Sequence, residues 1–224
     1  MTKARASEKK TEKAARREVI ATALAMSESG LSPGRSGNVS CRWTDGMLIT
    51  PTGKAYSELE ASDIVYMTAK GNVPGKQLKP SSEWHFHLAA YWARPDMSAL
   101  VHTHSPNATA LACAQKPIPA FHYMVAVAGG IDIPLVPYAT FGTEELAGNV
   151  ARGLADRNAI LMANHGAIAL GATLGAALEL AREVEVLAEQ YIKVLTLGPV
   201  HVLDDAEMAR VIVKFKTYGQ RGQG

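Results

Sequence analysis

Apolar residues recur along this chain with two spacings, every three or four positions in some segments and every second position in others. The first spacing is typical of helices that bury one face, and the second is typical of strands. Segment 174–198 keeps the helical spacing for longest and predicts the longest helix. The same spacing predicts shorter helices over residues 13–28, 81–94, 107–115, 143–156 and 205–217.

Residues typical of helix ends support these helices. The serines of PSSE are expected to cap the helix over 81–94, and Pro95 is expected to end it. Thr143 is expected to cap the helix that follows it. Gly30 and Pro33 mark the end of the first helix.

Strands are predicted where short apolar runs lie between turn residues. Asp45-Gly46 separates two such runs and is typical of a β-hairpin. Because strands alternate with helices while hairpins join some of them, the pattern predicts an α/β fold whose sheet is not purely parallel. The predicted strands cover residues 38–43, 46–53, 63–68, 99–104, 159–166 and 167–172.

The composition fits one globular domain. The chain has 224 residues, of which 47% are hydrophobic and 20% are charged, so it can bury a core without disulfides. Its two cysteines, Cys41 and Cys113, lack C-x-x-C spacing, which favours a reduced, cytoplasmic setting. No run of about 18 apolar residues is present, so no membrane span is expected.

The net charge is +2, and the basic surplus lies near the N-terminus, where residues 1–19 hold seven Lys or Arg against three Glu. We expect residues 1–12 to form a flexible basic tail and residues 13–221 to form the domain. The tail has no apolar core of a secretion signal. Acidic residues interrupt the basic ones and no aromatic side chain is available to stack on bases, so a nucleic-acid partner is not favoured.

Two histidines one residue apart, His102 and His104, lie in the apolar run ALVHTH. Side chains two apart on a strand project from the same face, so these imidazoles could share a metal ion. The alternative is an ordinary polar patch at a strand end. A third ligand from elsewhere in the chain is needed to favour the metal.

His165 is the best candidate for that third ligand, because it also ends a predicted buried strand. Sites in α/β proteins gather at strand ends, and three histidines there would leave a coordination position open, as in catalytic zinc sites. The alternative is a loop histidine beside a helix.

The remaining histidines have no such arrangement. His85 and His87 also form an H-x-H pair, but on a helix residues two apart diverge by about 200° and cannot share a metal. We interpret both as packing or surface residues. His122 and His201 have no partner at a useful spacing and are expected to be structural.

Glu83 is the candidate acid, in the first turn of the helix that starts with PSSE. The helix dipole alone would favour a carboxylate there. The functional interpretation is that two hydroxyls and free backbone N–H groups form an anion site with a base beside it. The loops GRSGNVS and TPTG also resemble anion sites, each weakly, because glycine-rich turns are common.

Taken together, these segments resemble the class II aldolase/adducin family, and within it the L-fuculose-1-phosphate aldolases. The resemblance runs in order from about residue 15 to 221. It rests on SGNVS, DGMLITPTG, PSSEWHFHLAAY, VHTH, HYMVAVAGG, PYATFGT, NHG, AREVEVLAEQY and KFKTYG.

The resemblance implies roles for individual residues. His102, His104 and His165 match the family's zinc ligands, and Glu83 matches the catalytic acid/base, which also ligates zinc in the resting enzyme. Tyr123 matches a tyrosine that reaches the active site of a neighbouring subunit and handles a proton. The substrate-phosphate pocket is matched by Gly37, Asn38, Thr52, Gly53, Ser81 and Ser82. Positions near the substrate or the C-terminal lid are matched by Phe141, Tyr218 and Arg221.

The resemblance also implies a three-layer α/β/α sandwich with a mixed, largely antiparallel sheet, assembled as a cyclic homotetramer with active sites at subunit interfaces. The implied reaction is the reversible cleavage of L-fuculose 1-phosphate, or a related ketose 1-phosphate, to dihydroxyacetone phosphate and a small aldehyde such as L-lactaldehyde. No lysine lies at a strand end in an apolar setting, so a zinc route is favoured over a Schiff base. Shielding from water is expected to bring the pKa of Glu83 toward the working pH.

The chain departs from the resemblance at both ends, where its N-terminal tail is longer and its C-terminal GQRGQG lacks the usual acids. Three alternatives therefore stay open beside the fuculose enzyme. One is an aldolase for 5-deoxyribulose or methylthioribulose 1-phosphate. Another is a sugar-phosphate epimerase or decarboxylase on the same scaffold, although epimerases typically carry Asp where this chain has Glu83. The last is a non-enzymatic, adducin-like binding module. The presence of the histidines, the acid and the phosphate loops together disfavours it.

Overall fold

The computed structural model describes residues 11–34 and 36–215. Tyr218 and Arg221 lie outside the described residues, as does nearly all of the expected basic tail. Within the described part, no helix is long and apolar enough to cross a membrane.

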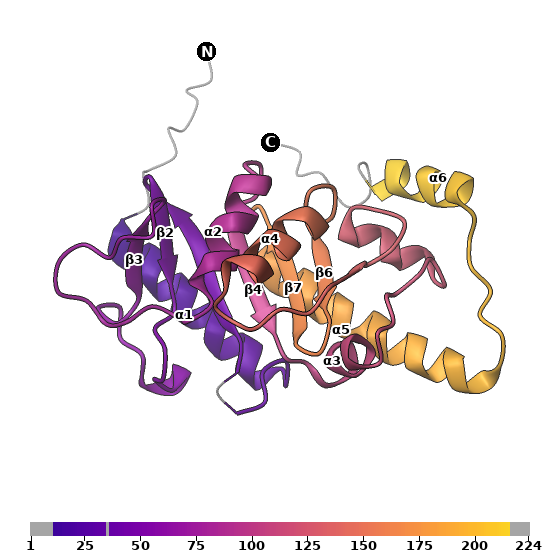
Figure 1. Ribbon diagram of the computed structural model, residues 1–224, viewed down its shortest axis with the longest axis horizontal. Coiled ribbons are helices and arrows are strands. Elements are labelled where there is room, and N and C mark those ends of the chain that lie inside the picture. Colours follow the sequence, from indigo (N-terminus) through magenta and orange to yellow (C-terminus); the bar gives the residue numbers. More distant parts are fainter. Residues whose placement is uncertain (1–10, 35, 216–224) are drawn as a thin grey trace, which may run out of the picture.

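The described part of the chain forms one seven-stranded sheet in the order β3-β2-β1-β4-β7-β6-β5 (Figure 1). Every neighbouring pair is antiparallel except β5 and β6, which are parallel, so the expected mixed, largely antiparallel sheet is confirmed. The strands are β1 Asn38–Trp43, β2 Gly46–Ile49, β3 Val65–Thr68, β4 Ala99–Thr103, β5 Leu135–Val136, β6 Ala159–Met162 and β7 Gly166–Gly171.

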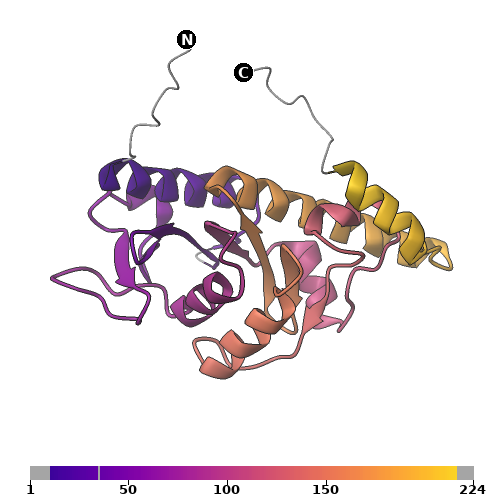
Figure 2. The same cartoon turned by 90° about the horizontal axis from the view of Figure 1, so that it is seen from above.

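Helices cover both faces of the sheet, which confirms the three-layer sandwich. The helices α1 and α5 lie on one side, and α2 and α4 lie on the other (Figure 2). The helix α6 lies at the end of the molecule away from β3 (Figure 1). The helices are α1 Glu12–Glu28, α2 Trp84–Ala93, α3 Pro106–Cys113, α4 Glu144–Gly153, α5 Leu174–Leu197 and α6 Asp205–Phe215, with short 3₁₀ turns η1 Tyr56–Glu58 and η2 Tyr123–Ala128.

The central strand β4 shows how the sequence divides these layers. Leu100 packs into the cluster with α2 and α4, whereas its neighbours Ala99 and Val101 pack into the cluster with α1 and α5. Successive side chains on a strand face opposite ways, so an unbroken apolar run supplies both cores at once.

Two predicted strands end early, and both ends matter for the site. The segment predicted as a strand over 46–53 leaves the sheet after Ile49, and Pro51 instead forms a bridge with Pro80. The segment predicted over 159–166 ends at Met162, and Asn164 (φ 54°) makes a turn before β7. Asn tolerates this left-handed conformation better than most residues, which explains the turn.

The capping prediction for α2 is wrong, whereas that for α4 is confirmed. The N-cap of α2 is Glu83, so the acid precedes the helix instead of lying in its first turn. Ser81 is tied to Thr50 through its backbone N–H, and its hydroxyl accepts from the Glu83 N–H. At α4, the Thr143 hydroxyl accepts from the Leu146 N–H as expected.

Candidate active site

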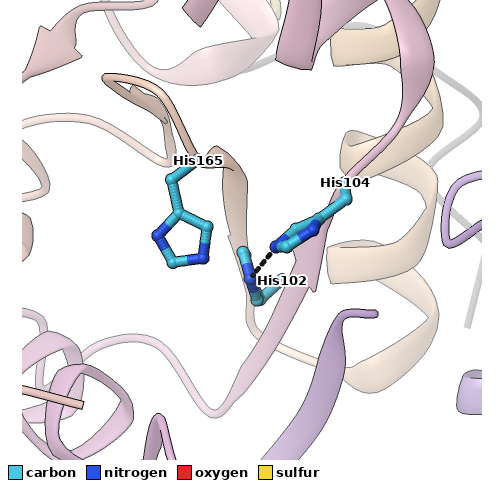
Figure 3. A group of neighbouring side chains, drawn as sticks. All are labelled: His102, His104 and His165. Carbon is cyan, nitrogen blue, oxygen red and sulfur yellow. Dashed lines mark hydrogen bonds between the residues drawn. The ribbon is translucent and has the colours of Figure 1, made fainter. Parts of the chain in front are cut away.

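The three predicted histidines come together at one end of the central strands. His102 is the last residue but one of β4, His104 follows that strand, and His165 lies in the turn before β7. Because β4 and β7 are antiparallel with Thr103 opposite Ala167, the end of one strand meets the start of the other. The metal-binding nitrogens of the three rings lie within 4.8 Å of one another (Figure 3).

The contacts of His102 leave its inner nitrogen free to bind a metal. The Nδ1 atom of His102 lies 2.9 Å from the Ala167 carbonyl oxygen, which can only accept, so Nδ1 carries the proton. The Nε2 lone pair of His102 therefore faces His104 Nε2, 3.0 Å away. Such a backbone contact to the outer nitrogen is typical of metal-binding histidines.

Glu83 completes this cluster. The Glu83 side chain is buried, with Oε2 at 3.3 Å from His102 Nε2 and Oε1 at 3.0 Å from His165 Nε2. The Oε2 atom accepts from Asn38 Nδ2 at 2.8 Å, but no described donor meets the buried Oε1 in hydrogen-bonding geometry. A buried carboxylate oxygen without a donor is unfavourable unless a cation lies beside it.

The protonation states agree with a cation site. Burial, with His102 and His165 nearby, lowers the pKa of His104 to about 3, so this ring is neutral and able to ligate at neutral pH. Burial raises the pKa of Glu83, but His102 and His165 outweigh it and hold that pKa well below its ordinary value. The expectation of a Glu83 pKa near the working pH is therefore wrong for this arrangement, because two imidazoles adjoin the carboxylate.

Three imidazole nitrogens and one carboxylate oxygen fit a divalent metal ion. This mixed nitrogen and oxygen set suits ions such as Zn²⁺ better than Ca²⁺ or Mg²⁺, which prefer oxygen ligands alone.

A cavity of about 370 Å³ opens beside the cluster. His102 is fully buried and is not among the residues that line this cavity. The cavity brings together most of the residues predicted from the sequence: Gly37, Asn38, Thr52, Gly53, Ser81, Ser82, Glu83, His104, Phe141 and His165.

Backbone pairing places the two predicted phosphate loops side by side. The Ser81 N–H donates to the Thr50 carbonyl and the Thr52 N–H donates to the Lys79 carbonyl, at 3.0 and 3.1 Å. TPTG therefore lies against PSSE along the cavity wall. Small polar residues and turn backbone of this kind suit an oxyanion.

Gly37 is required where the third loop approaches the cluster. Its φ is 84°, and a Cβ there would lie 2.7 Å from the His102 carbonyl oxygen and 2.4 Å from Ser32 Oγ. Only glycine combines this conformation with such close contact.

The family model for the class II aldolase and adducin N-terminal domain matches residues 17–192. The chain belongs to the class II aldolase family. Class II aldolases are metal-dependent carbon–carbon lyases, and this chain is one of them by the match together with relatives that are half identical to it.

Among relatives, the L-fuculose phosphate aldolase of Escherichia coli strain K12 is 52% identical over 92% of this chain and 95% of its own. The 5-methylthioribulose-1-phosphate/5-deoxyribulose-1-phosphate aldolase of Rhodospirillum rubrum is 50% identical over 94% of this chain and 95% of its own. A solved L-fuculose 1-phosphate aldolase structure has a TM-score of 0.87 and 42% identity, covering 90% of this chain and 96% of that one.

Two predicted residues of this class II aldolase lie apart from the centre of the cavity. Phe141 is 63% exposed at the cavity mouth. Tyr123 is 50% exposed in η2 and stacks on Phe215 of α6, outside the cavity of its own chain. Its expected action in a neighbouring subunit stays a prediction.

The sequence interpretation did not include Lys54, Tyr56 or Tyr138, which also line the cavity. Lys54 Nζ lies 2.6 Å from Asp63 Oδ2, and Lys54 is the sole Lys or Arg among the described lining residues. Tyr56 donates to the Gly37 carbonyl at 2.7 Å, and burial, then Glu83, raises its pKa, so it stays protonated. Their position directly after TPTG was the available signal for Lys54 and Tyr56.

The other four histidines lie outside the group formed by His102, His104 and His165, as predicted. His122 accepts from the Met124 N–H at the start of η2, and His201 is exposed. His85 stacks on Trp84, whereas His87 is fully buried and hydrogen bonded.

Proposed function

We propose that this class II aldolase reversibly cleaves L-fuculose 1-phosphate to dihydroxyacetone phosphate and L-lactaldehyde. The observation that carries the proposal is one cavity in which His102, His104, His165 and Glu83 lie beside the TPTG and PSSE loops. A ketose 1-phosphate presents a phosphate close to a ketone and a hydroxyl, which matches this pairing of an anion site with a metal site. The names of the half-identical relatives support the same substrate class.

We assign one Zn²⁺ per subunit to His102, His104 and His165, with Glu83 as a further ligand before substrate binds. When bound, the ion supplies a Lewis acid for the ketone and hydroxyl oxygens of the substrate and stabilises the negative charge left by bond cleavage. The contact of His102 Nδ1 with the Ala167 carbonyl orients its ring for this purpose.

The phosphate would lie among the three loops. Small residues allow the backbone N–H groups to approach it, and hydroxyls supply further donors. Lys54, at the edge of this pocket, adds a positive charge that Asp63 partly balances. The residues assigned to this pocket are Gly37, Asn38, Thr52, Gly53, Ser81 and Ser82.

Proton transfer is assigned to Glu83 and Tyr123. In the cleavage direction, Tyr123 in a neighbouring subunit would take the proton of the hydroxyl whose carbon becomes the aldehyde. Glu83, ionised before substrate binds, would take the proton of the hydroxyl next to the ketone and return it to the carbon that bears that hydroxyl, while Tyr123 would pass its proton to the oxygen left behind. Phe141 would contact the aldehyde part at the cavity mouth, with Tyr218 and Arg221 assigned to a C-terminal lid.

A homotetramer with active sites at subunit interfaces accounts for the position of Tyr123. This side chain is half exposed, and it lies outside the cavity of its own chain. We also propose a cytoplasmic setting, supported by bacterial relatives that act on sugar phosphates.

A second candidate substrate class is 5-methylthioribulose or 5-deoxyribulose 1-phosphate. It is favoured by the Rhodospirillum rubrum relative, which is 50% identical. These substrates share the phosphate and ketone end and differ at the aldehyde end, where Phe141 and Tyr138 lie exposed. Epimerase, decarboxylase and binding-module alternatives share the fold but yield no aldehyde by cleavage.

The test is an aldol assay of the Zn²⁺-loaded protein with dihydroxyacetone phosphate and L-lactaldehyde, acetaldehyde or methylthioacetaldehyde. We expect kcat/KM for L-lactaldehyde to exceed the other two at least tenfold. A preference for either of the others would assign the second substrate class. Absence of condensation with all three, in protein that retains one metal per chain, would refute the proposed aldolase.

A further inference from the structure

A chain of buried hydrogen bonds runs from Glu83 into the core between α2 and β1. Glu83 Oε2 meets Asn38 Nδ2 at 2.8 Å, and Asn38 Oδ1 meets His87 Nε2 at 2.5 Å. His87 Nδ1 meets Ser40 Oγ at 2.7 Å, and Ser40 Oγ meets the Tyr91 hydroxyl at 2.8 Å. All five residues are at most 8% exposed, and His87 is not exposed at all.

The residue spacing on β1 and on α2 brings the side chains of this hydrogen-bond network together. Asn38 and Ser40 are two apart on β1, so both face α2. His87 and Tyr91 are four apart on α2, so both lie on the helix face toward the sheet. The helix spacing that separates His87 from a metal role therefore directs it onto Asn38.

The hydrogen bonds of this network can run in one direction only, from donor to acceptor toward Glu83. An ionised Glu83 only accepts, so Asn38 must turn its NH₂ group to the carboxylate and its carbonyl oxygen to His87. His87 Nε2 must then donate to Asn38, which leaves Nδ1 to accept from the Ser40 hydroxyl. Ser40 in turn accepts from the Tyr91 hydroxyl.

Burial keeps the interior members in the required forms. Burial, then His102, lowers the pKa of His87 to about 3, so the ring is neutral with one donor and one acceptor nitrogen. Burial raises the pKa of Tyr91, so its hydroxyl remains a donor. Each neighbouring pair in this network then has one donor and one acceptor.

We propose that His87 is a positioning residue that fixes the Asn38 amide and, through it, the orientation of the Glu83 carboxylate. His87 does not line the cavity, and its hydrogen-bonded route to Glu83 runs through Asn38. Without the His87 N–H, the buried Asn38 carbonyl oxygen loses its donor, so the amide is held only through its bond to the Glu83 carboxylate. An amide that is no longer anchored from the core cannot hold the carboxylate in place, and both groups shift relative to the cluster.

This inference rests on the proposed role of Glu83 in proton transfer. The test therefore compares His87→Met, which removes the donor at similar volume, with His87→Gln, which can still donate to Asn38 and accept from Ser40. Tyr91→Phe is the matched control, because it changes the end of the hydrogen-bond network that is farthest from Glu83 and keeps the ring packing.

We expect His87→Met to lower kcat at least 30-fold, with KM and bound metal within twofold of wild type. His87→Gln should recover kcat to within fivefold, and Tyr91→Phe should stay within threefold. A purely structural role would instead reduce folded protein, metal and kcat together in all three variants, and that result would overturn the inference.

A crystal structure of His87→Met separates this inference from the proposed function. A shifted Asn38 side chain with a displaced Glu83 carboxylate supports the positioning role even if wild type cleaves no sugar phosphate. A carboxylate unmoved from its wild-type position overturns it, whatever the activity. If His87→Met does not fold, His87→Leu serves instead, because it also removes the donor to Asn38; an unmoved carboxylate and an unchanged kcat there would also overturn the inference.

Discussion

Replacing Glu83 with Gln removes the charge of the assigned acid/base while keeping its shape. The three imidazoles remain, with His102 still oriented by the Ala167 carbonyl. We therefore expect Glu83→Gln to keep its bound metal and to lose most of its turnover, because an amide cannot exchange the proton that the reaction needs.

The size of the loss follows from the position of the carboxylate. Glu83 is buried between His102 and His165, so solvent water has little access to replace it in proton transfer. General acid–base catalysis contributes about 10²- to 10⁴-fold in rate. That range is about 2.7 to 5.4 kcal/mol in activation free energy, at about 1.36 kcal/mol per tenfold.

The assay measures kcat for cleavage of the preferred sugar phosphate, together with metal content by atomic emission. Glu144→Gln is the matched control, because Glu144 is an exposed acid in the first turn of α4. We expect the control to stay within twofold of wild type. A Glu83→Gln protein with normal metal content and normal kcat would refute the acid/base assignment.

Three further predictions test the rest of the site. His102→Ala should bind less than a tenth of the wild-type metal and lose activity; metal analysis showing full occupancy would contradict the ligand assignment. Lys54→Met should raise KM for the sugar phosphate about tenfold with kcat within twofold, since it weakens a charge-assisted phosphate contact, whereas the exposed Lys76→Met should change neither. In metal-free protein, the neutral His87 should make the free energy of unfolding decrease as the pH is lowered. The reason is that the unfolded chain takes up a proton near pH 6.5 and the folded chain only near pH 3. From pH 7.5 to 5 this is roughly 2 kcal/mol, so urea unfolding of His87→Gln should show a drop smaller by that amount, and equal drops would contradict it.

The spacing of apolar and turn residues predicted those helices and strands that depend on neighbouring residues in the sequence. The long helix α5 and the hairpin of β1 and β2 follow from periodicity and from Asp45-Gly46. The start of α2 was predicted wrongly, because Ser81 is tied to Thr50, some thirty residues away along the chain. The two-residue strand β5 has too few residues to show any alternation.

The candidate site divides in the same way. The period of two predicted that His102 and His104 share a face, and the structure confirms it. Spacing alone left His165 ambiguous, because its place depends on the register between β4 and β7. The lowered pKa of Glu83 depends on His102 and His165, which are distant in sequence, so no local pattern indicated its direction.

His87 shows how a correct exclusion can leave a role unseen. Helical geometry correctly excludes a metal site shared by His87 and His85. It does not indicate which strand residues lie opposite His87 in the sheet. The partner appears only when β1 is placed under α2, with Asn38 at the strand end nearest His102. Since Asn38 contacts both His87 and Glu83, the same residue joins the interior of the fold to the assigned acid. Any change that shifts α2 along β1 should therefore alter turnover before it alters metal binding, because His102, His104 and His165 come from other elements.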